Sequence, residues 1–331
     1  MEMILVIPIL LGFFVTLFTL PYWIRGAKRV GLVGEDVHKK TKKEISEAGG
    51  IIVLLGFVLG VLVYIAIKTF ILKTDVTTVQ IFALLSTTLL AGIIGFVDDL
   101  LGWKIGLTKL PRILLLFFAA IPLIVINAGE STMMGINFGL LYPLVLIPVG
   151  ILGATVAFNT LEGFNGLGAS QGILILSALA LVTYLGGTTW LSLIVLCMVA
   201  SLLAFYIFNK TPAKVFPGDV LTYSVGALIA VVAIIGNIEK IAVFFFIPYI
   251  IETGLKLRGK LKKESFAKLN EKGGLELPHE KFYGLEHIAI YLLKKIKKDK
   301  EVKEKELVWL INLFQILVIV VGFLLFKGRV I

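Results

Sequence analysis

The stretch AFNTLEGFNGLGAS, residues 157–170, separates two long apolar runs in the middle of the chain. It holds two Asn, one Glu and three closely spaced Gly, whereas the runs at 138–157 and 167–186 are almost wholly apolar. Runs of this length match the ~20 residues that cross the hydrocarbon layer of a bilayer as a helix. The stretch is therefore expected to be a loop between two membrane-spanning helices, and its polar residues call for a functional explanation.

Apolar runs of spanning length recur along the whole chain, which is 58% hydrophobic and 16% charged. Soluble domains have about a quarter of their residues charged, so this composition excludes an ordinary soluble protein. We predict an all-α polytopic membrane protein made of a single domain, residues 1–331, whose first apolar run is a permanent helix and not a signal peptide. Ten transmembrane helices are expected, at residues 3–24, 49–70, 78–97, 112–127, 138–157, 167–186, 188–208, 220–236, 239–255 and 307–326.

Lys and Arg residues concentrate in alternate loops. Ten spans divide the loops into two sets, and one set holds 27 of the 32 Lys and Arg residues. The positive-inside rule places that set in the cytoplasm and both termini outside the cell membrane. This topology and the attraction of anionic lipids account for the net charge of +10 without a nucleic-acid partner. The cytoplasmic set comprises residues 25–48, 98–112, 158–166, 209–219 and the basic loop 256–306.

Polar residues at the ends of several spans fall on this same cytoplasmic face. GFVDDLLG (residues 95–102) contains Asp98 and Asp99, and VFPGDVLTYSVGA (residues 215–227) contains Asp219. Adjacent carboxylates repel unless a cation joins them, and Mg²⁺ takes one or two protein carboxylates together with substrate phosphates. Asn159 would add a neutral oxygen ligand. The pattern indicates a metal site for a phosphorylated substrate at the membrane surface.

Two further features suit a phosphate group. Lys104, Lys109 and Arg112 follow the Asp pair, and basic side chains beside carboxylates favour phosphate binding. The glycines of EGFNGLG and FPGD precede helices, whose N-termini favour anions.

Each of these features also has a purely structural interpretation. The Asp pair could be a solvated helix end, the glycines could serve close packing, and His279 and His287 could be surface histidines. The basic loop could be solvated or could contact lipid. Only the shared placement of the polar residues on one face favours a site.

Taken together, the motifs resemble those of the polyprenyl-phosphate N-acetylhexosamine-1-phosphate transferases, glycosyltransferase family 4. The resemblance runs nearly end to end, through GLVGEDVHKK…ISEAGG, GFVDDLLG, NTLEGFNGLGASQG and VFPGDVLTYSVGA, and is strongest to the dolichyl-phosphate GlcNAc-1-phosphotransferase branch. It implies that a lipid phosphate attacks the β-phosphorus of a UDP-N-acetylhexosamine and releases UMP. It also implies Mg²⁺, with Mn²⁺ as the alternative, a cytoplasmic active site in the cell membrane, and a homodimer.

The resemblance also implies roles for individual residues. Asp98 and Asp99 match the catalytic pair, with Asp98 deprotonating or orienting the lipid phosphate, and Asp219 and Asn159 match the metal ligands. The expected nucleotide-sugar contacts are Asp36, Glu47, Asn165, Lys263 and Ser265. The expected contacts to the phosphate or lipid phosphate are Lys109, Arg112 and Glu162.

The last cytoplasmic loop departs from the family pattern. Its stretch KKESFAKLN, residues 262–270, has no His where the family carries one, so Lys263, Ser265 and Lys268 are expected to take over contacts to the diphosphate or sugar. UDP-GlcNAc is the expected donor and dolichyl phosphate the expected acceptor. The alternatives are another UDP-N-acetylhexosamine or undecaprenyl phosphate, an ion-coupled transporter, and a membrane scaffold without catalysis.

Overall fold

The computed structural model describes residues 3–40, 43–74, 77–133, 135–263, 265–298 and 300–330, with the backbone alone described at 103–105, 109 and 328–330. Helices dominate these residues, and the strands form three short antiparallel pairs. The α-helices are α1 (Ile7–Arg29), α2 (Gly50–Ala66), α3 (Thr78–Ile105), α4 (Lys109–Phe118), α5 (Ile121–Val125), α6 (Ile147–Thr160), α7 (Leu167–Leu185), α8 (Thr189–Asn209), α9 (Gly218–Ile235), α10 (Glu239–Phe245), α11 (Ile247–Arg258), α12 (Leu285–Lys297) and α13 (Glu304–Val330).

Shorter elements complete the chain. The 3₁₀ turn η1 (Met3–Val6) precedes α1, and the π-helical segments η2 (Ile67–Leu72) and η3 (Tyr142–Leu146) extend α2 and precede α6. The strand pairs are β1 (Val33–Glu35) with β2 (Glu44–Ser46), β3 (Thr132–Met133) with β4 (Ile136–Asn137), and β5 (Lys268–Leu269) with β6 (Leu275–Glu276).

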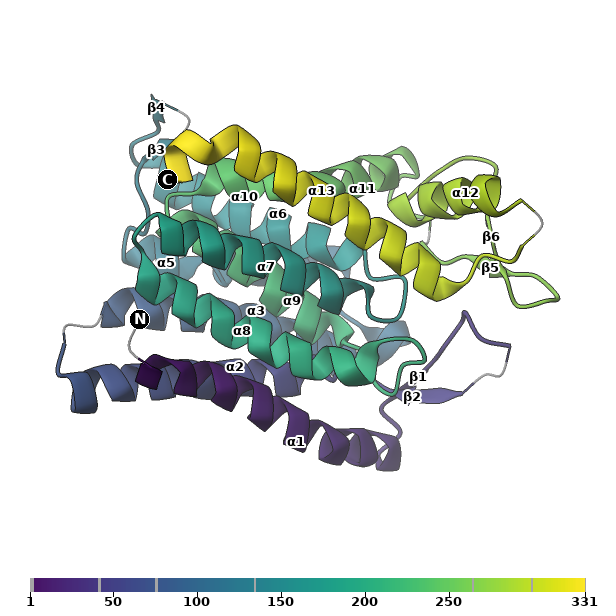
Figure 1. The fold of residues 1–331 in the computed structure, drawn as a ribbon, viewed down its shortest axis with the longest axis horizontal. Coiled ribbons are helices and arrows are strands. Elements are labelled where there is room, and N and C mark those ends of the chain that lie inside the picture. Colours follow the sequence, from purple (N-terminus) through teal and green to yellow (C-terminus); the bar gives the residue numbers. More distant parts are fainter. Residues whose placement is uncertain are drawn as a thin grey trace.

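The long helices run roughly side by side, so the molecule has two ends (Figure 1). The labelled N- and C-termini lie at one end, near β3 and β4, whereas β1, β2, β5 and β6 lie at the other. We call these the terminal end and the loop end. An even number of spans requires both termini to lie at the same end, as they do here.

Eight helices in the described residues are long and apolar enough to cross a membrane. They correspond to eight of the ten predicted spans, and the structure is that of an all-α polytopic membrane protein. The other two predicted spans, 112–127 and 239–255, are each divided, into α4 with α5 and α10 with α11. Pro122 and Pro248 stand at the first positions of the second helix in each pair, where the missing N–H of proline is tolerated but the preceding helix cannot continue. The count of ten spans stays a prediction.

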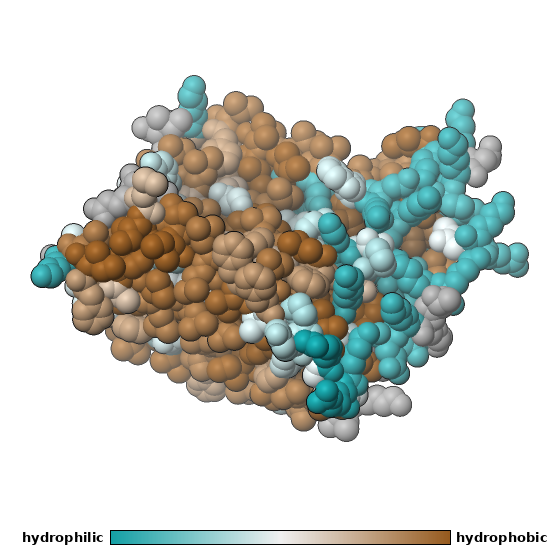
Figure 2. Space-filling model, turned by 60° about the horizontal axis from the view of Figure 1, so that its bottom comes forward, coloured by the Kyte–Doolittle hydropathy of each residue, from teal (hydrophilic) through white to brown (hydrophobic). Residues whose placement is uncertain are grey.

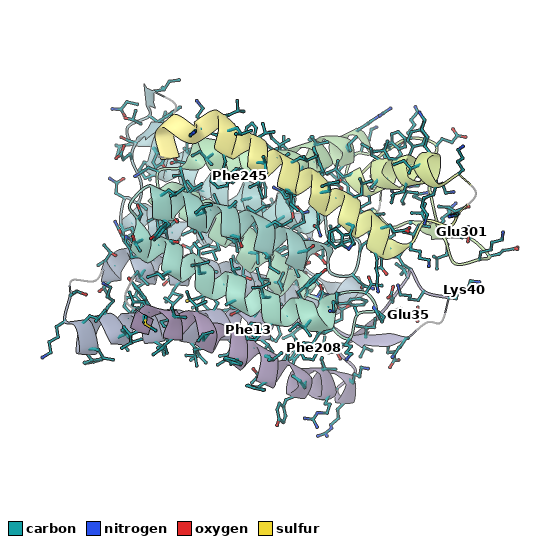
Figure 3. All side chains as sticks on the ribbon, viewed as in Figure 1. Phe13, Glu35, Lys40, Phe208, Phe245 and Glu301 are labelled. Atoms are coloured by element: carbon teal, nitrogen blue, oxygen red, sulfur yellow. The ribbon has the colours of Figure 1, made fainter. Side chains whose placement is uncertain are left out.

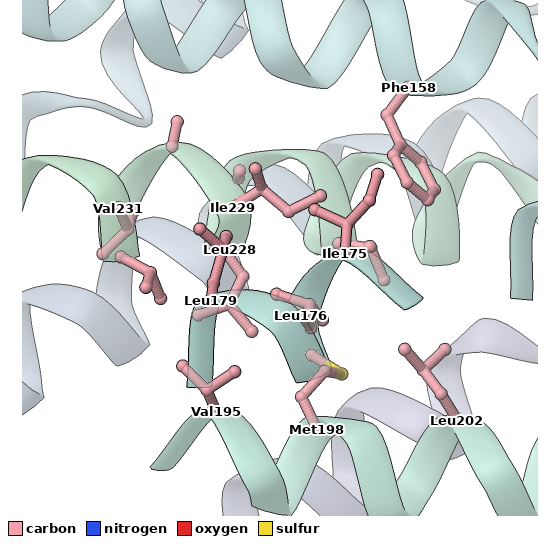
Figure 4. Close-up of a cluster of buried hydrophobic side chains, with 14 of the residues drawn as sticks. Phe158, Ile175, Leu176, Leu179, Val195, Met198, Leu202, Leu228, Ile229 and Val231 are labelled. Atoms are coloured by element: carbon pink, nitrogen blue, oxygen red, sulfur yellow. The ribbon is translucent and has the colours of Figure 1, made fainter. Parts of the chain in front are cut away.

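Helix α9 lies at the centre of the bundle and is almost completely buried. Leu228 of α9 packs in one apolar cluster with Leu176 and Leu179 of α7 and with Val195 and Met198 of α8 (Figure 4). The central position of α9 matters for the site, because its first turn carries Asp219.

The outer surface divides into an apolar band and a polar end. Hydrophobic residues cover most of the face seen in Figure 2, and hydrophilic residues gather over the loop end. Phe14 and Phe18 of α1 and Leu317 and Leu324 of α13 are exposed, as expected where lipid and not water surrounds the helices. Glu35, Lys40 and Glu301 mark the polar loop end in Figure 3, whereas Phe13 and Phe245 lie along the apolar helices.

Candidate active site

The site begins where the end of α3 packs against the first turn of α9. Gly95 of α3 faces the backbone of α9, and a Cβ at this position would lie 2.4 Å from the carbonyl oxygen of Asp219. The missing side chain therefore lets the two backbones approach closely. This contact places Asp98 and Asp99, which follow within one turn, beside Asp219.

Asp99 caps α9 from outside its own helix. Its carboxylate oxygens accept hydrogen bonds from the backbone N–H groups of Asp219, at 2.8 Å, and Val220, at 3.1 Å. Such bonds satisfy N–H groups that have no partner within the helix, and a negative charge is favourable at a helix N-terminus. Gly218 leaves the room, since a Cβ there would lie 2.3 Å from Asp99 Oδ2.

Asp98 has different partners. It accepts the N–H of Leu107 at 2.6 Å and forms an ion pair with Arg112. Its side chain is buried, at 6% exposure, so the interpretation of this pair as a solvated helix end is wrong. Arg112 is also held by the Leu107 carbonyl at 3.3 Å.

Glu47 joins the cluster because the end of the first loop is hydrogen-bonded to the loop before α9. The N–H of Phe216 donates to the Ser46 carbonyl at 2.7 Å, and the N–H of Gly49 donates to the Phe216 carbonyl at 2.9 Å. Burial, and next the negative charge of Asp219, raise the pKa of Glu47 to about 7. Glu47 is therefore a buried carboxyl group close to Asp219.

A cavity of about 400 Å³ opens beside these carboxylates. Among its lining are three aromatic side chains, Phe164, Phe216 and Phe266. Seven of the twelve residues predicted for the site also line it: Asp36, Glu47, Asp99, Asn159, Glu162, Asn165 and Asp219.

Asn159 and Glu162 reach the cavity from the end of α6 and the loop that follows. Asn159 Oδ1 accepts the Thr222 hydroxyl at 2.9 Å, which leaves a second lone pair on that oxygen. The Glu162 carboxylate points at the first turn of α7, since a Cβ on Gly168 would fall 1.5 Å from its Oε2. Burial raises the pKa of Glu162 to about 8, so at neutral pH this group is mostly protonated and repels a phosphate little.

Hydrogen bonds and an ion pair join three distant segments in another wall of the cavity. Asp36 accepts the N–H of His38 at 3.1 Å and the side-chain amide of Asn165 at 2.9 Å. The backbone N–H of Asn165 donates to Glu304 at 2.9 Å, and Lys39 forms an ion pair with Glu304. Asp36 and Asn165 therefore hold each other in place, and Glu304 at the start of α13 fixes the backbone of Asn165 without lining the cavity itself.

His38 connects the first and last loops. Its ring stacks on Phe164, with centroids 4.2 Å apart, and contacts Phe266 at 5.7 Å. Its Nε2 accepts the N–H of Ala267 at 3.2 Å, and burial lowers its pKa to about 4, so at pH 7 the ring is neutral and can accept that bond. His38 and Glu304 were not predicted as site residues, although His38 lies within the motif GLVGEDVHKK, residues 31–40.

The remaining predicted residues lie elsewhere or outside the described part. The side chains of Lys104 and Lys109 lie outside the described residues. The ammonium of Lys263 lies 6.0 Å from the ring centroid of Tyr283, and the Ser265 hydroxyl is buried and hydrogen-bonded to Lys256.

One histidine differs from expectation. His287 is 0% exposed and its Nδ1 accepts the N–H of Tyr283 at 3.1 Å. Its interpretation as a surface histidine is wrong, because α12 turns this side chain toward α11 and the loop after it. Burial lowers its pKa to about 4.

The donor atoms around the cavity suit a hard divalent cation. Asp219 and Asn159 offer oxygen ligands beside the cavity, and the buried carboxyl group of Glu47 lies close to Asp219. The carboxylate of Asp99 is already engaged by two backbone N–H groups. Over the described residues, no three His, Cys, Asp or Glu side chains surround a common metal position, so substrate phosphate oxygens would complete the coordination.

Comparisons with known proteins identify the family of the chain. Residues 81–237, from α3 to the turn after α9, match the family described as glycosyl transferase family 4. A Saccharolobus solfataricus protein with the provisional name UDP-N-acetylglucosamine–dolichyl-phosphate N-acetylglucosaminephosphotransferase is 38% identical over 92% of both chains. A Sulfolobus acidocaldarius protein with the same provisional name is 35% identical over 96% of this chain and 95% of its own. The phospho-N-acetylmuramoyl-pentapeptide-transferase of Streptococcus pyogenes is 28% identical over 75% of this chain and 77% of its own. The chain belongs to glycosyl transferase family 4.

Proposed function

We propose that this protein transfers N-acetylglucosamine-1-phosphate from UDP-N-acetylglucosamine to a polyprenyl phosphate and releases UMP. Dolichyl phosphate is the proposed acceptor. The observation that carries the proposal is the buried carboxylate cluster beside the cavity at the polar end of an apolar helix bundle. The names of the relatives that align over nearly the whole chain supply the donor and the acceptor.

A second cavity supports a long-chain lipid as the acceptor. It has a volume of about 680 Å³ and lies between η3 with α6, α9, and α10 with α11. Gly150, Gly153, Ala154 and Ala157 give α6 a flat face along it, and this face ends two residues before Asn159. An isoprenoid chain lying in this groove would bring its phosphate toward the carboxylate cluster.

Different residues would bind the lipid phosphate, the metal ion and the nucleotide. An oxygen of the lipid phosphate attacks the β-phosphorus of the UDP-sugar, and the bond from that phosphorus to the oxygen of UMP breaks. Arg112 would hold the lipid phosphate, and Asp98 would orient Arg112 through their ion pair. Because a phosphate monoester is already largely ionised near pH 7, orientation is the larger part of this role.

Asp219 and Asn159 would hold Mg²⁺, which supplies charge neutralisation of the diphosphate when it is bound. Asp99 fixes the first turn of α9 and thus the position of Asp219. Asn165, held by Asp36 and Glu304, would contact the nucleotide from the opposite wall.

The charge distribution supports a cytoplasmic site. The predicted cytoplasmic loops hold 27 of the 32 Lys and Arg residues, and the positive-inside rule orients the protein accordingly. UDP-sugars would then reach the cavity from the cytoplasm, and both termini would face outward.

Release of UMP by purified protein in detergent tests the proposal. UDP-GlcNAc and dolichyl phosphate should yield UMP only with both substrates and a divalent cation present. Asp219→Asn should abolish turnover, whereas the exposed Lys262→Met should not alter it. Turnover with another UDP-N-acetylhexosamine alone would change the donor, and no turnover with any nucleotide sugar from folded protein would favour a transporter or scaffold.

A further inference from the structure

A buried lysine lies directly behind the last loop of the cavity wall. Lys256, near the end of α11, is only 8% exposed, whereas Lys260 and Lys262 just after it are exposed. Taking an ammonium group out of water is costly unless each of its donors finds a partner. The position of Lys256 is therefore explained by what it binds.

The ammonium of Lys256 has three partners. Its Nζ lies 3.7 Å from Glu252 Oε1, one helical turn earlier, and donates to the Lys263 carbonyl at 3.3 Å. It also donates to the Ser265 hydroxyl. Two of the three partners belong to the loop after α11, so Lys256 ties that loop to the helix.

Ser265 also contacts the end of α6, the helix that carries Asn159. Its hydroxyl lies 3.4 Å from the carbonyl of Thr160, the last residue of α6 and the neighbour of Asn159. Residues 265–267, which we call the tethered segment, then reach the cavity, where Phe266 lines the wall and the Ala267 N–H donates to His38. The segment is thus held at Ser265 by Lys256 and at Ala267 by the first loop.

The surroundings of Lys256 are otherwise acidic. Glu252 accepts the N–H of Leu285 at the start of α12, and Glu286 is completely buried next to it. A Cβ on Gly163 of the cavity wall would lie 3.2 Å from Glu286 Oε1. Oxygen atoms of both carboxylates have no hydrogen-bond partner among the described residues. Removal of the Lys256 charge would therefore leave buried acidic groups uncompensated behind the cavity.

We propose that Lys256 is a positioning residue for the donor: through Ser265 it holds the tethered segment against the end of α6, and thereby sets the affinity for the UDP-sugar. This inference rests on the proposed function for its substrate, and the tether itself can be tested without any substrate. Ser265 would then contact Lys256 and the Thr160 carbonyl and not the sugar, which the sequence had predicted as its partner.

Kinetics of Lys256→Met and Ser265→Ala, with Lys262→Met as the matched control, test the proposal. A hydrogen bond to a charged group is worth about a tenfold change in equilibrium, so both variants should raise KM for UDP-GlcNAc, Lys256→Met by about tenfold. Both kcat and KM for the lipid phosphate should change less than about twofold. The double variant should be no worse than Lys256→Met, because one tether is broken in either case. A purely structural role would instead lower kcat for folded protein or affect both substrates alike.

Hydrogen exchange of the substrate-free protein gives an independent measurement. The backbone amide of Ala267, which donates to His38, should exchange at least about tenfold faster in both variants than in wild type or Lys262→Met. Unchanged exchange together with a wild-type donor KM in Ser265→Ala would overturn the proposal, even if Lys256→Met does not fold. If wild-type protein turns over no UDP-sugar, the proposed function fails, and the exchange comparison still decides whether the tether exists.

Discussion

Gly95→Ala should separate the acidic side chains at the end of α3 from Asp219, because the added methyl group would meet backbone and not a movable side chain. Its Cβ would lie 2.4 Å from the Asp219 carbonyl oxygen and 2.6 Å from the Val220 nitrogen. Ordinary contacts are roughly 3.5 Å, so α3 and α9 must move apart by about 1 Å. Overpacking of this kind costs about 1–3 kcal/mol, and the better helix propensity of Ala returns about 1 kcal/mol.

The effect on activity should exceed the effect on stability. A misplacement of about 1 Å in a catalytic constellation can lower the rate about 100-fold, whereas a net loss of about 0–2 kcal/mol lowers the melting temperature of a chain of this size by at most about 3 °C. UMP release and thermal unfolding of the same detergent preparation measure both. Gly26→Ala, with nothing within 4 Å of its Cβ, is the control and should match wild type in both. Wild-type turnover by Gly95→Ala would refute the inference that this helix contact sets the site.

Three more predictions follow from contacts in the site. Asp99→Ala should lower the free energy of unfolding by about 1–2 kcal/mol, as the loss of a helix cap does. Asp99→Asn should lower it by less, because the amide keeps one acceptor oxygen. Equal melting temperatures for wild type and both variants would contradict the role of Asp99 as a cap. The pKa of His38 is about 4 in the folded protein and 6.5 as a free group. Between pH 6.5 and 4 the unfolded chain therefore binds a proton at His38 that the folded protein does not, so the free energy of unfolding falls as the pH falls. His38→Gln should therefore lose less melting temperature over this pH range than wild type, and parallel curves would exclude the assignment. Gly168→Ala should displace the Glu162 carboxylate from α7 and reduce turnover in the UMP assay, while Gly26→Ala, at an open helical position with nothing within 4 Å, should leave turnover unchanged.

The sequence was most informative where the signal is local. Apolar runs predicted eight helices that the structure shows as continuous, and the ordered motifs predicted the family, which the comparisons confirm. The division of the spans 112–127 and 239–255 was not predicted, although Pro122 and Pro248 stand where the second helices begin. A length-based prediction joins such pairs, since apolar composition continues through the break.

The partners of each polar side chain could not be predicted from the sequence. Asp98 and Asp99 are adjacent, yet one pairs with Arg112 and the other caps α9, because successive helix positions point in different directions. The burial of Ser265 on Lys256 depends on how α11 packs, and no pattern in KKESFAKLN encodes it. The contact of Glu304 with Asn165 joins residues 139 positions apart, which only the folded chain reveals.

That last contact has a consequence for the order in which the protein is made. Glu304 begins the final helix, and it joins Asn165 to Lys39 across the cavity wall. Ribosomes synthesise chains from the N-terminus, so every residue of the stretch that matches the family, 81–237, emerges well before this wall can close. A chain that ends before residue 304 would carry all the acidic groups of the cluster but lack the contacts that hold Asn165 and Lys39. Asn165 can therefore reach its final position only after the last helix has begun to pack.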